Sequence, residues 1–210
     1  MRKGKSAVGD AKSSSMTWGP LIVLCIACFI LVFDTTAMSV AINDLVVDLD
    51  TNISTIQAIM AIYTLVMASM MLMGAKLGDM YGRKKVFLIG VAVYGVGTVT
   101  AALSPNTGVL FTGWSLIEGL AAAAMLPATM ALLASSYPNP KNRATAFAIY
   151  GGIAAAGAAV GPMLGGFIIS ALSWRWVFAG ELILVVVILI CSRMLKEVEI
   201  DASKRPSMDI

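Results

Sequence analysis

Long apolar stretches, separated by short charged or turn-rich segments, constrain this chain more than any other feature of its sequence. An α-helix needs roughly 20 apolar residues to cross the hydrocarbon core of a bilayer, which is about 30 Å thick. The sequence supplies six such stretches, near residues 18–43, 53–75, 86–104, 108–136, 144–171 and 176–192. We therefore expect an all-α membrane protein with six transmembrane helices.

Composition agrees with a membrane protein and argues against several enzyme classes. Hydrophobic residues make up 59% of the 210 residues and charged residues 13%, whereas soluble domains carry about 25% charged residues. Histidine is absent, which removes the imidazole base of Ser-His and Cys-His catalysis and a common metal ligand. Hydrolases, metalloenzymes and a six-helix intramembrane protease are therefore disfavoured, and we expect no enzyme, no cofactor and no metal.

Cys25 and Cys28 have the spacing of a redox pair but lie inside an apolar stretch. A thiolate is disfavoured in such surroundings. We interpret the two cysteines as small apolar side chains that pack between helices.

The distribution of basic residues predicts the orientation of the helices. Six helices place both termini on one side, and the segments on that side hold 14 of the 15 Lys and Arg residues, leaving Arg175 opposite. Because basic segments are retained in the cytoplasm, we expect a multi-pass protein of the cytoplasmic (inner or plasma) membrane with both termini inside. The basic residues thus define topology, and we expect no nucleic acid as a partner.

We expect three parts along the chain. Residues 1–17 form a cytoplasmic tail, residues 18–192 form the six-helix bundle, and residues 193–210 form a second cytoplasmic tail or the start of a loop to a further half.

The segment after the second stretch combines glycines with opposite charges. Asp79 and Arg83 are four residues apart and pair on a helical turn, and Gly82 permits a sharp reversal. An ordinary basic turn would explain Lys84 but not Asp79 or the glycines. The segment resembles the loop motif G-x-L-x-D-x-x-G-R-K of the major facilitator superfamily, with Ala75 in place of the first glycine. The matching residues are Leu77, Asp79, Gly82, Arg83 and Lys84.

The fifth stretch carries glycines four residues apart, a spacing that lets helix backbones approach closely. Generic small-residue packing would explain the spacing, but not the proline after the second glycine or the final glycine pair. The segment resembles the antiporter motif G-x-x-x-G-P-x-x-G-G of drug:proton exchangers. Its matching residues are Gly157, Gly161, Pro162, Gly165 and Gly166.

Two further segments resemble the fourteen-helix branch of the drug:proton antiporters. Asp34, Thr36, Val40 and Ala41 match a D-x-T-x-x-N-x-A segment, with Ser39 in place of asparagine, and residues 174–178 match W-R-W-x-F. The chain as a whole resembles the N-terminal six-helix half of the proteins of that family. The resemblance implies two inverted three-helix repeats, with the first and fourth helices in corresponding places.

Three acidic residues lie inside the apolar stretches: Asp34, Glu118 and Glu181. A carboxylate in a spanning helix costs about 2.5–3.5 kcal/mol, which indicates a function. A carboxyl removed from water favours its neutral form, so it holds a proton and releases it when water or a cation arrives. We interpret the three acids as proton- and substrate-coupling residues.

A structural alternative for these acids stays open. They are then protonated, or hydrogen-bonded to Thr35, Ser39 or Ser115, and only hold helices together. The family often has an arginine where this chain has Ser115, so any proton coupling would fall to the carboxyl groups.

The resemblance implies proton-coupled efflux of small amphipathic or cationic compounds, of the multidrug type, driven by the proton gradient. The implied partners are the substrate, protons, the lipid bilayer and a second six-helix half, in the same longer chain or in a second copy. We expect the glycine face of the fifth helix and the loop latch at Asp79 and Arg83 to meet that second half. The alternative is a truncated or half-size membrane protein with a binding or regulatory role and no transport by itself.

Overall fold

The computed structural model describes residues 16–195, which form an all-helical bundle. The elements follow one another as α1 (Trp18–Val40), α2 (Ile42–Asp48), α3 (Ile53–Tyr81), α4 (Arg83–Ala102), α5 (Thr107–Leu110), the π-helix η1 (Phe111–Glu118), α6 (Gly119–Ser136), α7 (Pro140–Ala171), α8 (Arg175–Cys191) and the 3-10 helix η2 (Ser192–Met194). Within that range six spans are long and apolar enough to cross a membrane, α5, η1 and α6 together forming the fourth. The predicted six-helix fold is confirmed.

Several helices are longer than the apolar stretches that predicted them. Helix α3 continues past residue 75 to Tyr81, and α7 begins at Pro140 rather than near residue 144. Charged residues at these ends, such as Asp79 and Lys141, continue the helices beyond their apolar stretches. The short helix α2 was not expected, and it buries Leu45.

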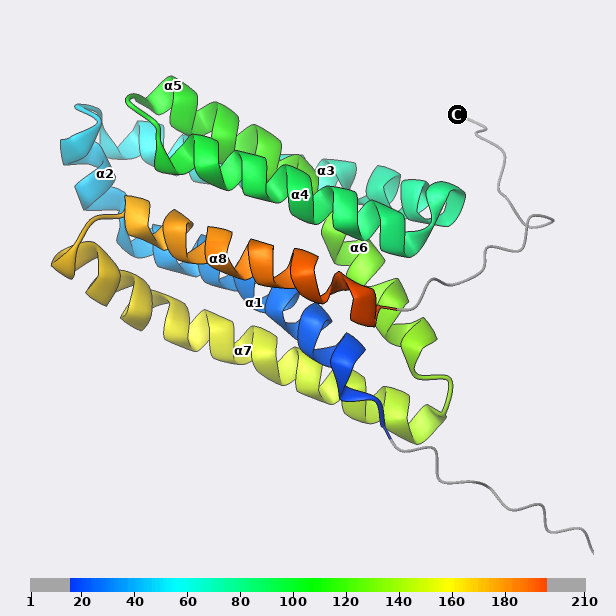
Figure 1. The fold of residues 1–210 in the computed structure, drawn as a ribbon. Helices are drawn as coiled ribbons and strands as arrows, with labels where there is room; N and C mark the ends of the chain where they lie inside the picture. Colours follow the sequence, from blue (N-terminus) through cyan, green and yellow to red (C-terminus); the bar gives the residue numbers. More distant parts are fainter. Residues whose placement is uncertain (1–15, 196–210) are drawn as a thin grey trace, which may run out of the picture.

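Polar residues in the connections explain where three helices begin. The side chains of Asn52, Asn106 and Asn139 accept hydrogen bonds from the backbone N–H groups of Thr55, Val109 and Lys141. Each bond satisfies one of the N–H groups that the first turn of a helix leaves free. These short capped connections reverse the direction of the chain between consecutive spans (Figure 1).

The helices form two groups that pack face to face. Figure 1 shows α3, α4 and α5 on one side and α1, α7 and α8 on the other, with α6 running from the first group toward the start of α7. Helix α1 packs most extensively on α7, α3 packs on α6, and α4 contacts α8 across the two groups. The start of α1 and the end of α8 lie at the same end of the bundle (Figure 1), as six antiparallel spans require.

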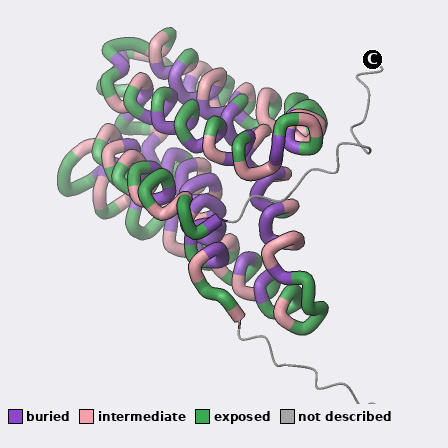
Figure 2. Tube along the Cα trace, turned by 45° about the vertical axis from the view of Figure 1, so that its right-hand side comes forward, coloured by how far each residue is buried: buried purple, intermediate pink, exposed green. Residues whose placement is uncertain are grey.

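Buried residues face the middle of the bundle, and exposed residues follow its outer surfaces (Figure 2). Helices α3 and α7 are the least buried of the six spans. Leu72 on α3 is 82% exposed and Met163 on α7 is 73% exposed. These apolar surfaces suit contact with lipid or with another protein segment rather than with water.

The glycine face of α7 requires a correction. We expected it to meet a second half, but Gly157, Gly161 and Gly165 are buried against α1 of the same bundle. A Cβ added to Gly165 would lie 2.7 Å from the Cβ and 2.9 Å from the Cα of Ala37. The close approach of two helix backbones, which small residues allow, is therefore made within this chain.

Candidate functional site

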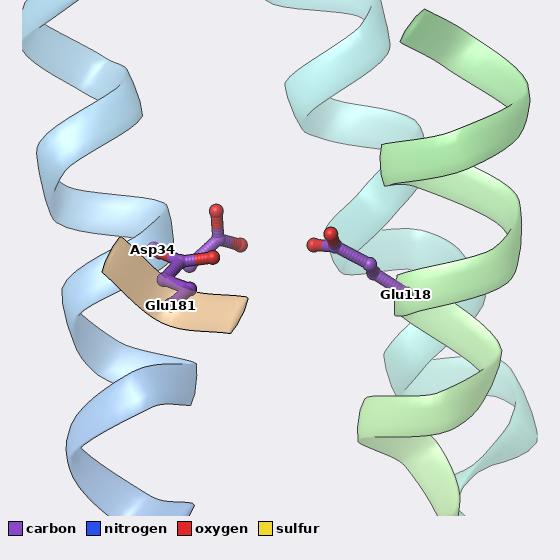
Figure 3. Close-up of side chains that lie close together, drawn as sticks. All are labelled: Asp34, Glu118 and Glu181. Carbon is purple, nitrogen blue, oxygen red and sulfur yellow. The ribbon is translucent and has the colours of Figure 1, made fainter. Parts of the chain in front are cut away.

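The three acidic residues of the apolar stretches come together at the centre of the bundle. Asp34 lies on α1, Glu118 is the last residue of η1, and Glu181 lies on α8. Their side chains point toward one another (Figure 3), and one carboxylate oxygen from each lies within 4.8 Å of the other two. The exposed fractions are 0% for Asp34, 0% for Glu118 and 1% for Glu181. We call these three residues the acid cluster.

A π-helix and a glycine place Glu118 in the acid cluster. The wider i→i+5 turns of a π-helix often occur at functional sites, and η1 ends at Glu118. Opposite it, α4 presents Gly97, where an added Cβ would lie 2.5 Å from the Cγ of Glu118 and 2.8 Å from the carbonyl oxygen of Gly113. The missing side chain of Gly97 thus leaves room for the stem of Glu118.

Asp34 has one strong partner that the sequence had not indicated. The indole Nε1 of Trp114 donates a hydrogen bond of 2.8 Å to Oδ2 of Asp34. Trp114 is buried and stacks on Tyr63, with ring centroids 5.8 Å apart. A buried indole N–H needs an acceptor. A tryptophan inside an apolar stretch, four residues before Glu118, was therefore the sequence signal for a hydrogen bond to one of the acids.

The other oxygens of the acid cluster are unsatisfied. Among the described residues, Oδ1 of Asp34 and both carboxylate oxygens of Glu118 and of Glu181 have no hydrogen-bond partner. The Tyr94 hydroxyl interacts with Glu118 and Glu181, but within residues 16–195 it makes no hydrogen bond of normal length and angle. Such atoms are rare in folded proteins and call for an explanation, such as a functional role or a bound ion.

The hydroxyl groups that we had considered as partners of the acids bind elsewhere. Thr35 donates to the carbonyl of Val32 at 3.1 Å, and Ser39 donates to that of Thr36 at 2.6 Å. Ser115 donates to the carbonyl of Ile59 at 2.7 Å. In a helix these short side chains reach the preceding turn of backbone, so this part of the structural alternative is wrong.

No basic side chain compensates the acid cluster within the described part of the chain. The Lys and Arg residues between positions 16 and 195 all lie in the first or last two turns of helices or in η2. Three carboxylates this close, in surroundings of low dielectric, repel one another strongly. The cluster therefore requires protons or a cation to neutralise it.

The acid cluster is separate from the groove between α1, α7 and α8. That groove has a volume of about 380 Å³ and is lined by apolar side chains such as Ile22, Phe29 and Leu184. It contains none of the three acids.

The loop motif lies at the junction of α3 and α4, away from the acid cluster. Arg83 donates two hydrogen bonds to Oδ1 of Asp79, at 3.1 and 3.2 Å. Gly82 ends α3 with a φ of 105°, a conformation that only glycine adopts readily. Lys84 donates to the carbonyl of Leu195 at 2.6 Å and so ties the start of α4 to the chain that follows α8. Leu77 lies one turn before the junction, half-buried.

A second polar group lies at the opposite end of the bundle. The guanidinium of Arg175 pairs with Asp48 and donates to the carbonyl of Ser104 at 2.9 Å. Trp174 donates to the same aspartate at 3.1 Å, and the guanidinium carbon of Arg175 lies over the Trp174 ring, 4.3 Å from its centroid. This outer clamp joins α2, the α4–α5 connection and the start of α8.

Comparison with known proteins relates the chain to one transporter family. The family model described as Major Facilitator Superfamily matches residues 24–208. The chain is 33% identical over 159 residues to the puromycin resistance protein pur8 of Streptomyces alboniger, covering 76% of this chain and 31% of that protein. It is 31% identical over 172 residues to the methylenomycin A resistance protein of Bacillus subtilis, covering 81% of this chain and 37% of that protein.

Other matches agree with this relation. The multidrug resistance protein Stp of Mycobacterium tuberculosis is 33% identical over 158 residues, covering 75% of this chain and 29% of that protein. The crystal structure of a peptide transporter POT in complex with sulfate superposes with a TM-score of 0.73 at 19% identity, covering 83% of this chain and 37% of that one. The chain thus spans about a third of the length of the curated relatives it matches.

Proposed function

Because this chain belongs to the Major Facilitator Superfamily, we propose that it forms the N-terminal half of a proton-coupled exporter of small amphipathic or cationic compounds. The protein is a multi-pass membrane transporter of that family, and its curated relatives include antibiotic and multidrug resistance proteins. We place both termini in the cytoplasm, on the side where the basic residues gather. The second six-helix half, in a longer chain or in a second copy, completes the transport path.

The acid cluster is the observation that carries this proposal. The three buried carboxyl groups accept a single hydrogen bond in total, from Trp114 to Asp34, and no basic residue lies beside them in the described part of the chain. Carboxyl groups in such surroundings bind protons readily. Removing one proton leaves a negative charge in the apolar centre of the bundle. A positively charged or polarisable substrate near the cluster offsets that charge, so that substrate binding and proton release favour each other.

The packing of α1 supports a path from the acid cluster to the antiporter motif. Asp34 and Thr36 lie half a turn apart on α1, and an added Cβ on Gly161 of α7 would lie 2.9 Å from the Cβ of Thr36. A change in charge at Asp34 therefore acts on a helix that is in close backbone contact with α7. We assign the α1–α7 seam the role of transmitting the protonation state to the helix movements of transport.

The loop motif supports a latch at the cytoplasmic end. The ion pair between Asp79 and Arg83 spans the break at Gly82, where α3 reverses into α4. Both side chains are partly exposed, so they are available to a second half that packs beside them. We assign this group a role in holding one conformation of the complete transporter.

Proton release on substrate addition tests the proposal. Tetraphenylphosphonium, a lipophilic cation, is added to the detergent-purified chain in weak buffer, and pH and oligomeric size are recorded on the same sample. We expect proton release that is lost in at least one of Asp34→Asn, Glu118→Gln and Glu181→Gln. The exposed residue Asp50 supplies the matched control, since Asp50→Asn leaves the cluster intact. No release from a folded sample would overturn proton-coupled export by this half and favour a half-size protein with a binding or regulatory role.

A further inference from the structure

The oxygen atoms around the acid cluster have the arrangement of a cation site. Three carboxylate oxygens lie within 4.8 Å of one another, so a point exists no farther than 4.8/√3, about 2.8 Å, from all three. Calcium binds oxygen ligands at about 2.3–2.6 Å, whereas magnesium requires about 2.0–2.1 Å. Because 2.8 Å is the upper limit, a movement of at most about 0.5 Å by each side chain reaches the calcium range. Calcium also accepts irregular coordination, whereas magnesium demands a near-ideal octahedron of ligands.

An independent observation points to a ligand at this place. The Tyr94 hydroxyl is fully buried and lies beside Glu118 and Glu181, yet it makes no hydrogen bond of normal length and angle with any residue between 16 and 195. A buried phenol normally finds a partner. Its oxygen is therefore the candidate for a fourth ligand beside the three carboxylates.

The chemistry of the donors selects a hard cation. All the available donors are oxygens, which suit calcium, magnesium and manganese rather than zinc or copper. The absence of histidine led us to expect no metal from the sequence. Hard cations do not require histidine ligands, so this absence does not argue against them. A double positive charge together with one retained proton neutralises three carboxylates.

We propose that Asp34, Glu118, Glu181 and the Tyr94 hydroxyl bind one calcium-sized divalent cation in exchange for protons. The inference deepens the proposed function, because it assigns a second ligand to the cluster that we take to exchange protons. If the cluster holds three protons when no ion is bound, binding one ion releases two and leaves one, so the site stays neutral. The ion and the protons then compete for the same oxygens.

Terbium luminescence and calcium titration test the site on the full chain in detergent. Trp114 is hydrogen-bonded to Asp34, so a terbium ion in the cluster lies close enough to be sensitised by the indole. We expect luminescence that calcium displaces far more effectively than magnesium, with release of about two protons per ion in weak buffer. We expect binding to weaken at least about 100-fold in Glu118→Gln and Glu181→Gln, and roughly tenfold in Tyr94→Phe.

Two control variants separate the site from adventitious binding. Ser115→Ala alters a buried polar residue of η1 that bonds to the Ile59 carbonyl instead of the acids. The double variant Asp44→Asn/Asp50→Asn, called the outer-loop variant, removes exposed acids of α2 and of the connection from α2 to α3. Both should bind terbium and calcium like the parent chain, and circular dichroism melting shows that each variant is folded. Binding that is unchanged in Glu118→Gln and Glu181→Gln, or lost in the outer-loop variant, would overturn the proposal.

The two proposals fail separately. Proton release by tetraphenylphosphonium with no calcium or terbium binding would retain the exchange function and overturn the cation site. Calcium binding that depends on the acid cluster, without proton release by tetraphenylphosphonium, would support the cation site and overturn proton-coupled export by this half.

Discussion

At the scale of single residues, the buried acids carry a cost that their neighbours do not offset. A carboxyl group inside the bundle must either lose its hydration as an ion or take a proton from solvent. Asp34 recovers part of this cost through Trp114, whereas Glu118 and Glu181 have no hydrogen-bond partner within the described residues. Side chains kept at such a cost are characteristic of function rather than of stability.

Replacing Glu118 by glutamine should therefore stabilise the bundle. The amide has nearly the same shape and is neutral at every pH, whereas the buried glutamate has to take up a proton at neutral pH, so we expect a gain of about 1–3 kcal/mol. Circular dichroism melting in detergent measures the change as a higher apparent unfolding temperature. Glu118→Ala serves as the comparison, because it also removes the side-chain volume and should lower that temperature. A lower temperature for Glu118→Gln would mean that the carboxyl makes a stabilising interaction.

Arg175 illustrates the opposite case, a charge whose partners are all present. It pairs with Asp48 and bonds to the Ser104 carbonyl at the outer end of the bundle. Because both charged side chains are more than a third exposed, we expect Arg175→Ala to cost only about 1 kcal/mol. Thermal unfolding in detergent at low and high salt measures this loss and its screening. The exposed Arg193 supplies the control, and an equal effect of Arg193→Ala would contradict a specific outer clamp.

At the scale of helices, small residues decide which elements touch. Gly74 brings α3 against the backbone of α6, Gly97 admits the stem of Glu118, and Gly165 brings α7 against α1. An added Cβ at Gly74 would lie 2.4 Å from the carbonyl oxygen of Ala123. These contacts order the bundle because helices in lipid associate through close packing rather than through burial from water.

The paired glycines of the antiporter motif provide a direct test of the α1–α7 seam. Gly165→Ala places a Cβ 2.9 Å from the Cα of Ala37, which requires a shift of the backbone, whereas in Gly166→Ala the nearest atom is Cγ1 of Val40 at 3.6 Å. We expect Gly165→Ala to destabilise the bundle by about 1–3 kcal/mol. Gly166→Ala should be neutral or slightly stabilising. Thermal unfolding of the two variants under the same conditions measures the difference in stability. Equal unfolding temperatures would show that α1 and α7 can move apart at no cost.

At the scale of the whole molecule, charge and exposed apolar surface define how the bundle sits in its surroundings. The described basic residues gather mainly where α3 joins α4 and where α7 begins, while Asp44, Asp48 and Asp50 lie at the opposite end. The positive-inside rule then orients the bundle. The weakly buried surfaces of α3 and α7 remain for lipid or for a second half.

This orientation predicts which residues react from outside an intact cell. In a background without the native cysteines, Asp44→Cys should react with a membrane-impermeant maleimide in intact cells. Lys141→Cys should react only after permeabilisation. Both positions are exposed in the structure, so access to the reagent depends on the side of the membrane alone. The reverse pattern would place both termini outside.

Sequence patterns predicted the number of spans, their order and their approximate limits, because the thickness of a bilayer imposes a length and an apolar composition on each helix. They also indicated Asp34, Glu118 and Glu181 as unusual residues, because a charge inside such a span is costly wherever it lies. They did not predict α2, the π-helix or the role of Trp114. These features depend on contacts between helices rather than on the composition of any one of them.

The sequence by itself determined a six-helix membrane bundle of a known transporter family with one acid in each of three spans. Only the tertiary structure decided that the acids share one centre, that Trp114 and Tyr94 border it, and that the glycines of α7 pack on α1 instead of on a second half. The physical reason lies in the uniform apolarity of the spans. When nearly every position is apolar, the pattern does not state which face of a helix points inward, and close packing between particular side chains makes that choice.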